Sequence, residues 1–141
     1  MCKMEKSMMF GAEKLNYKDY SPITLAYIGD TVYDLFLRTK ILEKGERPIN
    51  DIHKDAISAV SAAAQARSVH NIEGYLTEEE RGILKWGRNA KSGHVPKNAD
   101  AVDYRWATGF EALVGALYLR GETERLEEIL NLAYLNKEDK R

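Results

Sequence analysis

Two acidic residues stand out because each lies in a segment that is otherwise apolar. Asp30 falls within LAYIGDTVYDLFLRTKIL, residues 25–42, where Asp34 is the only other acid. Glu111 is the only charged residue in WATGFEALVGALYL, residues 106–119. An ionised carboxylate that leaves water without a partner costs several kcal/mol, so a half-buried acid requires a cation or hydrogen-bond donors. These segments therefore predict a site that needs a counter-charge.

Both segments have the spacing of apolar helices, with hydrophobic residues at steps of three and four. The buried stripe of the first helix is expected to consist of Leu25, Ile28, Val32 and Leu35. Tyr27, Asp30 and Asp34 share a different face. The second segment is apolar nearly all round, which predicts a buried helix. Its Gly115, one turn beyond Glu111, indicates that another element packs close to the backbone.

If these two helices cross at Asp30 and Glu111, the carboxylates form a pocket for a hard divalent cation, which takes oxygen ligands and keeps some waters. Mg²⁺ is the natural candidate. The simpler interpretation is that each acid forms a structural ion pair, but no cationic residue lies within one helical turn of either acid. Asp34 is expected to support the site from outside, by orienting a ligand or a bound water.

The composition indicates one globular domain: 141 residues and 16.0 kDa, with 44% hydrophobic and 30% charged residues. A single cysteine, Cys2, fits a reducing compartment. The first ten residues lack the apolar run of a signal peptide, and no stretch approaches the ~20 apolar residues of a membrane span. We expect a cytoplasmic protein with no membrane partner.

A basic strip lies on a chain whose net charge is only -1. Residues 81–99 contain five lysines and arginines and no acid. Such a strip is often just a solvated surface. Its functional interpretation is contact with phosphates, because lysine and arginine bind a sugar-phosphate backbone with affinity that falls with salt. The candidate residues are Lys85, Arg88, Asn89, Lys91, Ser92 and Lys97.

The elements that position these residues are all expected to be helices. Residues 1–17 form a loosely ordered lead, and a helix starts at Ser21 and Pro22 and runs to about Lys44. A second helix is expected over residues 51–70.

Thr77 and Glu80 form a capping box that starts the next helix, which gives way to an exposed loop over residues 86–98. Asp100 starts the helix of Glu111. A final helix spans residues 122–136, followed by a tail at 137–141. The domain proper is expected to cover residues 18–136.

Particular motifs in these helices resemble a known family. LAYIGDTVYDLFLR resembles the signature helix of the ribonuclease III catalytic domain, and FEALVGALYL resembles that family's second metal-binding helix. Together with GRNAKSGHVPKN and YRWATGFEAL, they make the chain similar to Mini-III, the compact bacterial branch that has no double-stranded-RNA-binding domain. The resemblance runs from about Thr24 to Tyr134. It implies an all-α ribonuclease III fold that forms a homodimer.

By position, the resemblance makes Asp30 and Glu111 the catalytic and metal-binding residues, and places Tyr27 at the dimer interface. Ala26 and Thr108 stand where ordinary ribonuclease III has carboxylates, as they do in Mini-III, so the number of metal ions stays open. Thr108, like Asp34, is expected to support the site from outside.

The implied reaction is hydrolysis of phosphodiester bonds in double-stranded RNA with Mg²⁺, or alternatively Mn²⁺. The implied substrate is precursor 23S ribosomal RNA, and help from a ribosomal protein stays open. The basic strip would then bind RNA. One alternative is a noncatalytic RNA-binding or ribosome-associated relative with the same fold, suggested by the missing carboxylates. Another is an all-α nucleotide phosphohydrolase, because those enzymes also hold metals with helical acids.

Overall fold

The computed structural model describes residues 13–90 and 100–138, with side chains through Tyr134 in the second range. Within these ranges the chain is helical and contains no strand, as the sequence predicts. The elements, in chain order, are the 3₁₀ helix η3 (Tyr17–Asp19), α1 (Pro22–Leu42), α2 (Ile49–Ala59), α3 (Ala62–Ile72), the 3₁₀ helix η4 (Glu73–Tyr75), α4 (Glu78–Arg88), α5 (Ala101–Leu119) and α6 (Thr123–Glu138).

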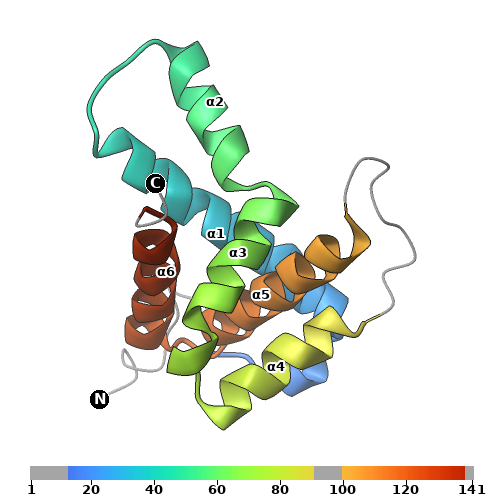
Figure 1. Ribbon diagram of the computed structural model, residues 1–141. Helices are drawn as coiled ribbons and strands as arrows, with labels where there is room; N and C mark the ends of the chain where they lie inside the picture. The colour runs from blue at the N-terminus through green and yellow to red at the C-terminus, as the bar shows by residue number, and fades with distance from the viewer. Residues whose placement is uncertain (1–12, 91–99, 139–141) are drawn as a thin grey trace.

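Helix α5 is the centre of the fold. It contacts α1, α3, α4 and α6, and Figure 1 shows these helices gathered around it. Phe110, Leu113 and Val114 have no exposed surface, and neighbouring residues of α5 are buried on the other sides of the helix. The prediction of a helix that is buried nearly all round is therefore confirmed.

Helices α1 and α5 touch backbone to backbone. A Cβ atom added to Gly29 would overlap the carbonyl of Glu111, and a Cβ added to Gly115 would overlap the carbonyl of Leu25. This confirms the close packing expected at Gly115. The contact also brings Asp30, the neighbour of Gly29, to the crossing where Glu111 lies.

The buried stripe of α1 differs from the one expected. Leu25 is buried, but Leu35 is 55% exposed, and the core side chains are Tyr33, Leu37 and Ile41. The reason is that the face meeting α5 is centred on Gly29, which has no side chain and so contributes nothing to a hydrophobic pattern. Tyr33 then packs edge-on against Phe110, with ring centroids 5.0 Å apart.

The single helix expected over residues 51–70 is in fact two. Helix α2 ends at Ala59 and α3 begins at Ala62, with Ser61 as its N-cap: the Ser61 hydroxyl accepts a hydrogen bond from the backbone N–H of Ala64. The sequence did not indicate the start of α3, because alanines on both sides of Ser61 favour a continuous helix. Helix α2 extends away from the rest of the bundle (Figure 1), whereas α3 packs on α5 and α6.

The remaining helix starts agree with the sequence. Ser21 caps α1, Thr77 and Glu80 form the expected capping box of α4, and Asp100 caps α5. Helix α4 continues to Arg88, so the loop expected from residue 86 begins later. Its part at 91–99 lies outside the described residues.

The packed structure begins within the segment expected to be a loose lead. The Leu15 amide donates to the Leu119 carbonyl at 2.7 Å, and the buried Tyr17 donates its hydroxyl to Glu79. Residues 1–12 of that segment and 139–141 of the expected tail lie outside the described ranges. No helix within those ranges is long and apolar enough to cross a membrane.

Candidate active site

Asp30 and Glu111 meet in one pocket, which we call the acidic pocket. It has a volume of about 200 Å³ and is lined by Ile23, Ala26, Tyr27, Asp30, Tyr104, Thr108 and Glu111. Its walls come from the N-terminal half of α1 and from α5. The two acids singled out in the sequence thus line one pocket, and the close crossing of α1 and α5 is what brings them together.

The electrostatics of the acidic pocket are unfavourable for two free carboxylates. Burial raises the pKa of Glu111 to about 8, helped by the negative charge of Asp30 and a hydrogen bond with it, while a side-chain hydrogen bond from Gln65 opposes the rise. The folded pocket thus favours the protonated form of Glu111. A positive charge in the pocket would favour loss of that proton, and no lysine or arginine among the described residues lines it.

The donor set fits a hard divalent cation held partly by water. Mg²⁺ is bound in proteins by one or two carboxylates while it keeps several waters. Among the described residues, no group of three or more histidine, cysteine, aspartate and glutamate side chains forms a richer ligand cluster. Asp30 and Glu111 are the residues that would hold Mg²⁺, and the pocket volume leaves room for its waters.

Ala26 and Thr108, which the sequence resemblance matches to carboxylate positions, line the same pocket. Ala26 offers only a methyl group. The Thr108 hydroxyl donates to the Tyr104 carbonyl at 2.9 Å, one turn earlier in α5. Thr108 thus lies in the wall of the acidic pocket, and its hydroxyl hydrogen is engaged in this bond within α5.

Asp34 and Tyr27 lie on the exposed side of α1. Asp34 accepts a hydrogen bond from Arg38 Nε at 2.9 Å and is not part of the pocket lining. Asp34 therefore pairs with a residue of its own helix. No contact among the described residues supports the role expected for it beside the acidic pocket. Tyr27 is 77% exposed at the edge of the pocket, together with the partly exposed Ile23.

The basic strip is described only in part. Lys85 is exposed on α4, and the Arg88 guanidinium lies 4.8 Å from the ring centre of Trp106. Arg88 Nε also donates to the side-chain carbonyl of Asn89. Three of the candidate residues lie outside the described ranges: Lys91, Ser92 and Lys97.

The sequence interpretation missed the polar residues behind Glu111. Gln65 and Ser68 on α3 are 2% and 1% exposed, and Tyr33 on α1 is fully buried. Gln65 is the only glutamine in the chain, set among alanines, and that isolation was the signal available. Tyr104, which lines the pocket from α5, was also missed.

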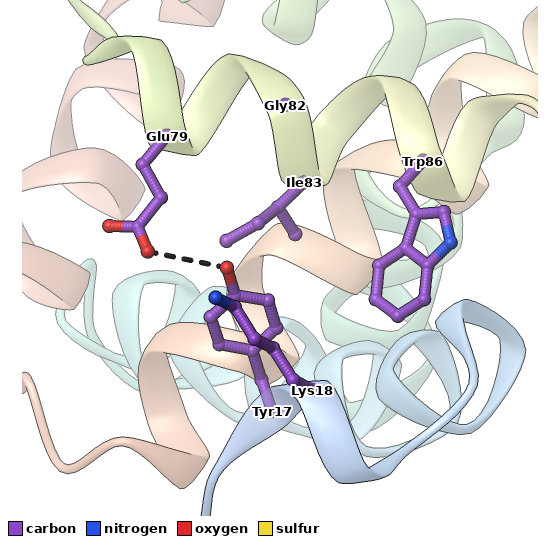
Figure 2. A pocket seen from close by; sticks show the side chains of 6 residues that line it. All are labelled: Tyr17, Lys18, Glu79, Gly82, Ile83 and Trp86. Carbon is purple, nitrogen blue, oxygen red and sulfur yellow. Dashed lines mark hydrogen bonds between the residues drawn. The ribbon is translucent and has the colours of Figure 1, made fainter.

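A second hollow lies between η3 and α4, lined by Tyr17, Lys18, Glu79, Gly82, Ile83 and Trp86 (Figure 2). Its volume is about 430 Å³, and it shares no lining residue with the acidic pocket. Its one carboxylate, Glu79, accepts a hydrogen bond from Tyr17 and pairs with Arg120 at 3.2 Å. Because that carboxylate is already engaged, this hollow is unsuited to holding a cation.

The fold and the acidic pocket match one class of proteins. A family model described as the ribonuclease III domain matches residues 23–122, a range that contains both Asp30 and Glu111. The chain belongs to the ribonuclease III family.

Within that family the matches are to one compact branch. The Mini-ribonuclease 3 of Thermoanaerobacter sp. (strain X514) is 49% identical over 92% of this chain and 96% of its own length. That of Clostridium tetani is also 49% identical, over 84% of this chain and 80% of its own length. The present chain is thus a member of the Mini-ribonuclease 3 branch.

A solved structure agrees with this placement. The crystal structure of a protein from Fusobacterium nucleatum superposes with a TM-score of 0.75 and 31% identity, covering 85% of this chain and 96% of that one. The all-helical ribonuclease III fold expected from the sequence is thereby confirmed.

Proposed function

We propose that this protein is a Mg²⁺-dependent endoribonuclease that hydrolyses phosphodiester bonds in double-stranded RNA. Membership of the ribonuclease III family supports endoribonuclease activity. The observation that carries the proposal is the acidic pocket, where Asp30 and Glu111 from two helices share a site that no cationic side chain lines within residues 13–90 and 100–134. Mn²⁺ is an alternative ion, because it takes the same oxygen ligands.

In this mechanism, Asp30 and Glu111 would hold the cation, which would supply the charge needed at the attacked phosphate. A bound divalent cation lowers the pKa of a coordinated water and stabilises charge on the attacked phosphate and the leaving oxygen. Asp30 is exposed, whereas burial raises the pKa of Glu111, so Glu111 would hold a cation from the buried side and Asp30 from the solvent side. Ala26 leaves space that a longer acid would fill.

RNA binding is assigned to the candidate residues of the basic strip, which are Lys85, Arg88, Asn89, Lys91, Ser92 and Lys97. Duplex RNA is recognised mainly by its shape and by phosphate and 2′-hydroxyl contacts. The stacking of Arg88 on Trp106 holds one guanidinium in a fixed place on α4, and Lys85 lies one turn before it. Such contacts position a duplex without reading its sequence.

A homodimer would give two acidic pockets, one for each strand. The proposed interface includes Tyr27, whose 77% exposure on the well-packed α1 leaves a large aromatic side chain without cover. Exposed aromatic residues of this kind are enriched at protein interfaces. The proposed substrate is precursor 23S ribosomal RNA in the cytoplasm, with a ribosomal protein as a candidate helper.

A cleavage assay on a long RNA duplex with Mg²⁺ tests the proposal, with single-stranded RNA and duplex DNA as controls. We expect cleavage of the RNA duplex alone, and its loss in Asp30→Asn and Glu111→Gln. Asp34→Asn is the matched control, because Asp34 lies on the same helix but outside the acidic pocket; it should retain activity.

A second candidate, a noncatalytic RNA-binding relative, is favoured by one observation. Ala26 and Thr108 occupy the pocket wall without carboxylates, so two acids line the pocket in the part of the chain that the structure describes. Duplex RNA that is bound but stays intact with both Mg²⁺ and Mn²⁺ would select this candidate and reject the enzyme.

A further inference from the structure

Gln65 lies behind the acidic pocket, on the side of Glu111 that faces away from solvent. It projects from α3, which packs on α5, and its side chain is 2% exposed. The Gln65 amide donates to the Val60 carbonyl at 3.4 Å and lies close enough to Glu111 to lower the pKa of that carboxyl. A buried amide thus connects the metal-binding acid to the break between α2 and α3.

That break is what makes the Val60 carbonyl available. In a continuous helix this carbonyl would accept the Ala64 amide, but the Ser61 hydroxyl caps that amide instead. One hydrogen of the Gln65 amide can therefore point to Val60 and the other to Glu111. The Val60 carbonyl can only accept a hydrogen bond, so the nitrogen of the Gln65 amide faces it, which fixes the orientation of the group.

Two further polar side chains are buried in this region: Tyr33, which lies near Glu111, and Ser68, which lies near Tyr33. The Gln65 carbonyl oxygen and both hydroxyls have no hydrogen-bond partner of good geometry, although all three residues are almost fully buried. Tyr33 lies near Ser68 and Glu111: burial raises its pKa to about 12, Ser68 opposes the rise, and Glu111 adds to it. An unsatisfied buried polar atom costs about 1–3 kcal/mol, so such atoms near a functional acid require a reason.

We propose that Gln65 is a positioning residue for Glu111, whose carboxylate it holds from the buried side in the orientation that binds the divalent cation. This inference rests on the proposed function, because it assumes that Glu111 is a metal ligand. Groups that orient a metal ligand from behind change metal affinity by about 10–100-fold when they are removed. Gln65 touches neither substrate nor metal in this arrangement, so it acts only through Glu111.

The test compares Mg²⁺ binding by the full-length wild type and by Gln65→Met, which keeps the size of the side chain but removes the amide. Binding is followed by calorimetry without RNA, and cleavage is measured across a Mg²⁺ titration. We expect Gln65→Met to raise the Mg²⁺ dissociation constant about 10-fold or more, with cleavage recovering at high Mg²⁺. In a Glu111→Gln background the same substitution should have no further effect on Mg²⁺ binding.

Asn71→Leu is the matched control. Asn71 is also on α3 with a buried, unpartnered amide nitrogen, but it is absent from the groups that affect Glu111. It should change thermal stability while leaving Mg²⁺ affinity alone. If Gln65→Met does not fold, Gln65→Asn replaces it, because its shorter amide cannot reach both Val60 and Glu111.

The wild type separates the two proposals. A wild type that neither binds Mg²⁺ nor cleaves duplex RNA rejects the proposed function and this inference with it. A wild type that does both, together with a folded Gln65 variant of unchanged Mg²⁺ affinity, rejects the positioning role alone.

Discussion

Gly29 of α1 lies directly against the backbone carbonyl of Glu111 on α5, so closely that no side chain fits between them. Asp30 is the next residue along α1. The distance between the two acids is therefore set by a contact between backbones, which is stiffer than a contact between side chains. The geometry of the acidic pocket depends on a residue that has no functional group.

The first prediction concerns this contact. Gly29→Ala must force α1 and α5 apart, and such overpacking costs about 1–3 kcal/mol, occasionally more. It should also weaken Mg²⁺ binding, because Asp30 and Glu111 separate. Gly82→Ala is the control: a Cβ there meets nothing within 4 Å in the middle of α4, and it should stabilise the protein by about 0.5–1 kcal/mol. Equal stability of the two variants in denaturant unfolding would contradict the prediction.

The second prediction concerns the pH dependence of stability without metal. Burial and Asp30 raise the pKa of Glu111 from 4.5 to about 8 in the folded protein. The folded chain thus keeps a proton that the unfolded chain loses above pH 4.5. The stability contributed by this group is complete below that pH and is lost as the pH rises to about 8.

Thermal unfolding in a chelator between pH 4.5 and 8 measures this effect. Wild type should lose stability relative to Glu111→Gln across this range, since glutamine does not titrate. Added Mg²⁺ should restore wild type at pH 8, because it binds the ionised carboxylates, and should do less for Glu111→Gln. Parallel curves for the two proteins would show that Glu111 does not titrate as inferred.

The third prediction concerns the ion pair between Glu80 of α4 and Arg125 of α6. Arg125 donates to both oxygens of the buried Glu80 carboxylate at 2.7 Å, and its hydrogen bonds hold the pKa of Glu80 below its ordinary value. Arg125→Met leaves that carboxylate unpaired and should cost about 2–3 kcal/mol, given the partial exposure of the arginine.

Arg38→Met is the matched control for that measurement. Arg38 pairs with Asp34 on the exposed side of α1, where ion pairs contribute about 0–1 kcal/mol. The Glu80 contribution should be present at neutral pH and disappear as the pH falls through the lowered pKa of Glu80 in the folded protein. A loss for Arg125→Met no larger than for Arg38→Met would refute the structural role.

The fourth prediction concerns RNA affinity. Lys85 is exposed on α4 and can reach a phosphate. Lys85→Gln should therefore weaken duplex RNA binding and reduce by about 1 the slope of the logarithm of affinity against the logarithm of salt concentration. Lys54→Gln, an exposed lysine on α2 outside the basic strip, should leave both unchanged. Binding titrations at several salt concentrations with Asp30→Asn protein avoid cleavage during the measurement. If the two lysine variants showed the same salt dependence of RNA binding, Lys85 would not contact the RNA.

The sequence by itself determined the helical class, most helix starts and the two acids. Local chemistry is sufficient for these, because a cap such as Thr77 with Glu80 acts within one turn, and hydrophobic periodicity reports a helix without reference to the rest of the fold. The isolation of Asp30 and Glu111 in apolar helices likewise identified the acidic pocket before any contact was known. The homology of the two motifs then placed the chain in its family.

Only the tertiary structure decided which face of α1 is buried, where α2 ends and what lies behind Glu111. Gly29 lets α1 contact the backbone of Glu111 because it has no side chain. A hydrophobic pattern cannot indicate such a contact. The Arg125–Glu80 pair joins residues 45 positions apart, and Gln65 reaches Glu111 from a different helix. These relationships depend on how helices are placed in space, and a periodicity within one helix carries no information about its neighbours.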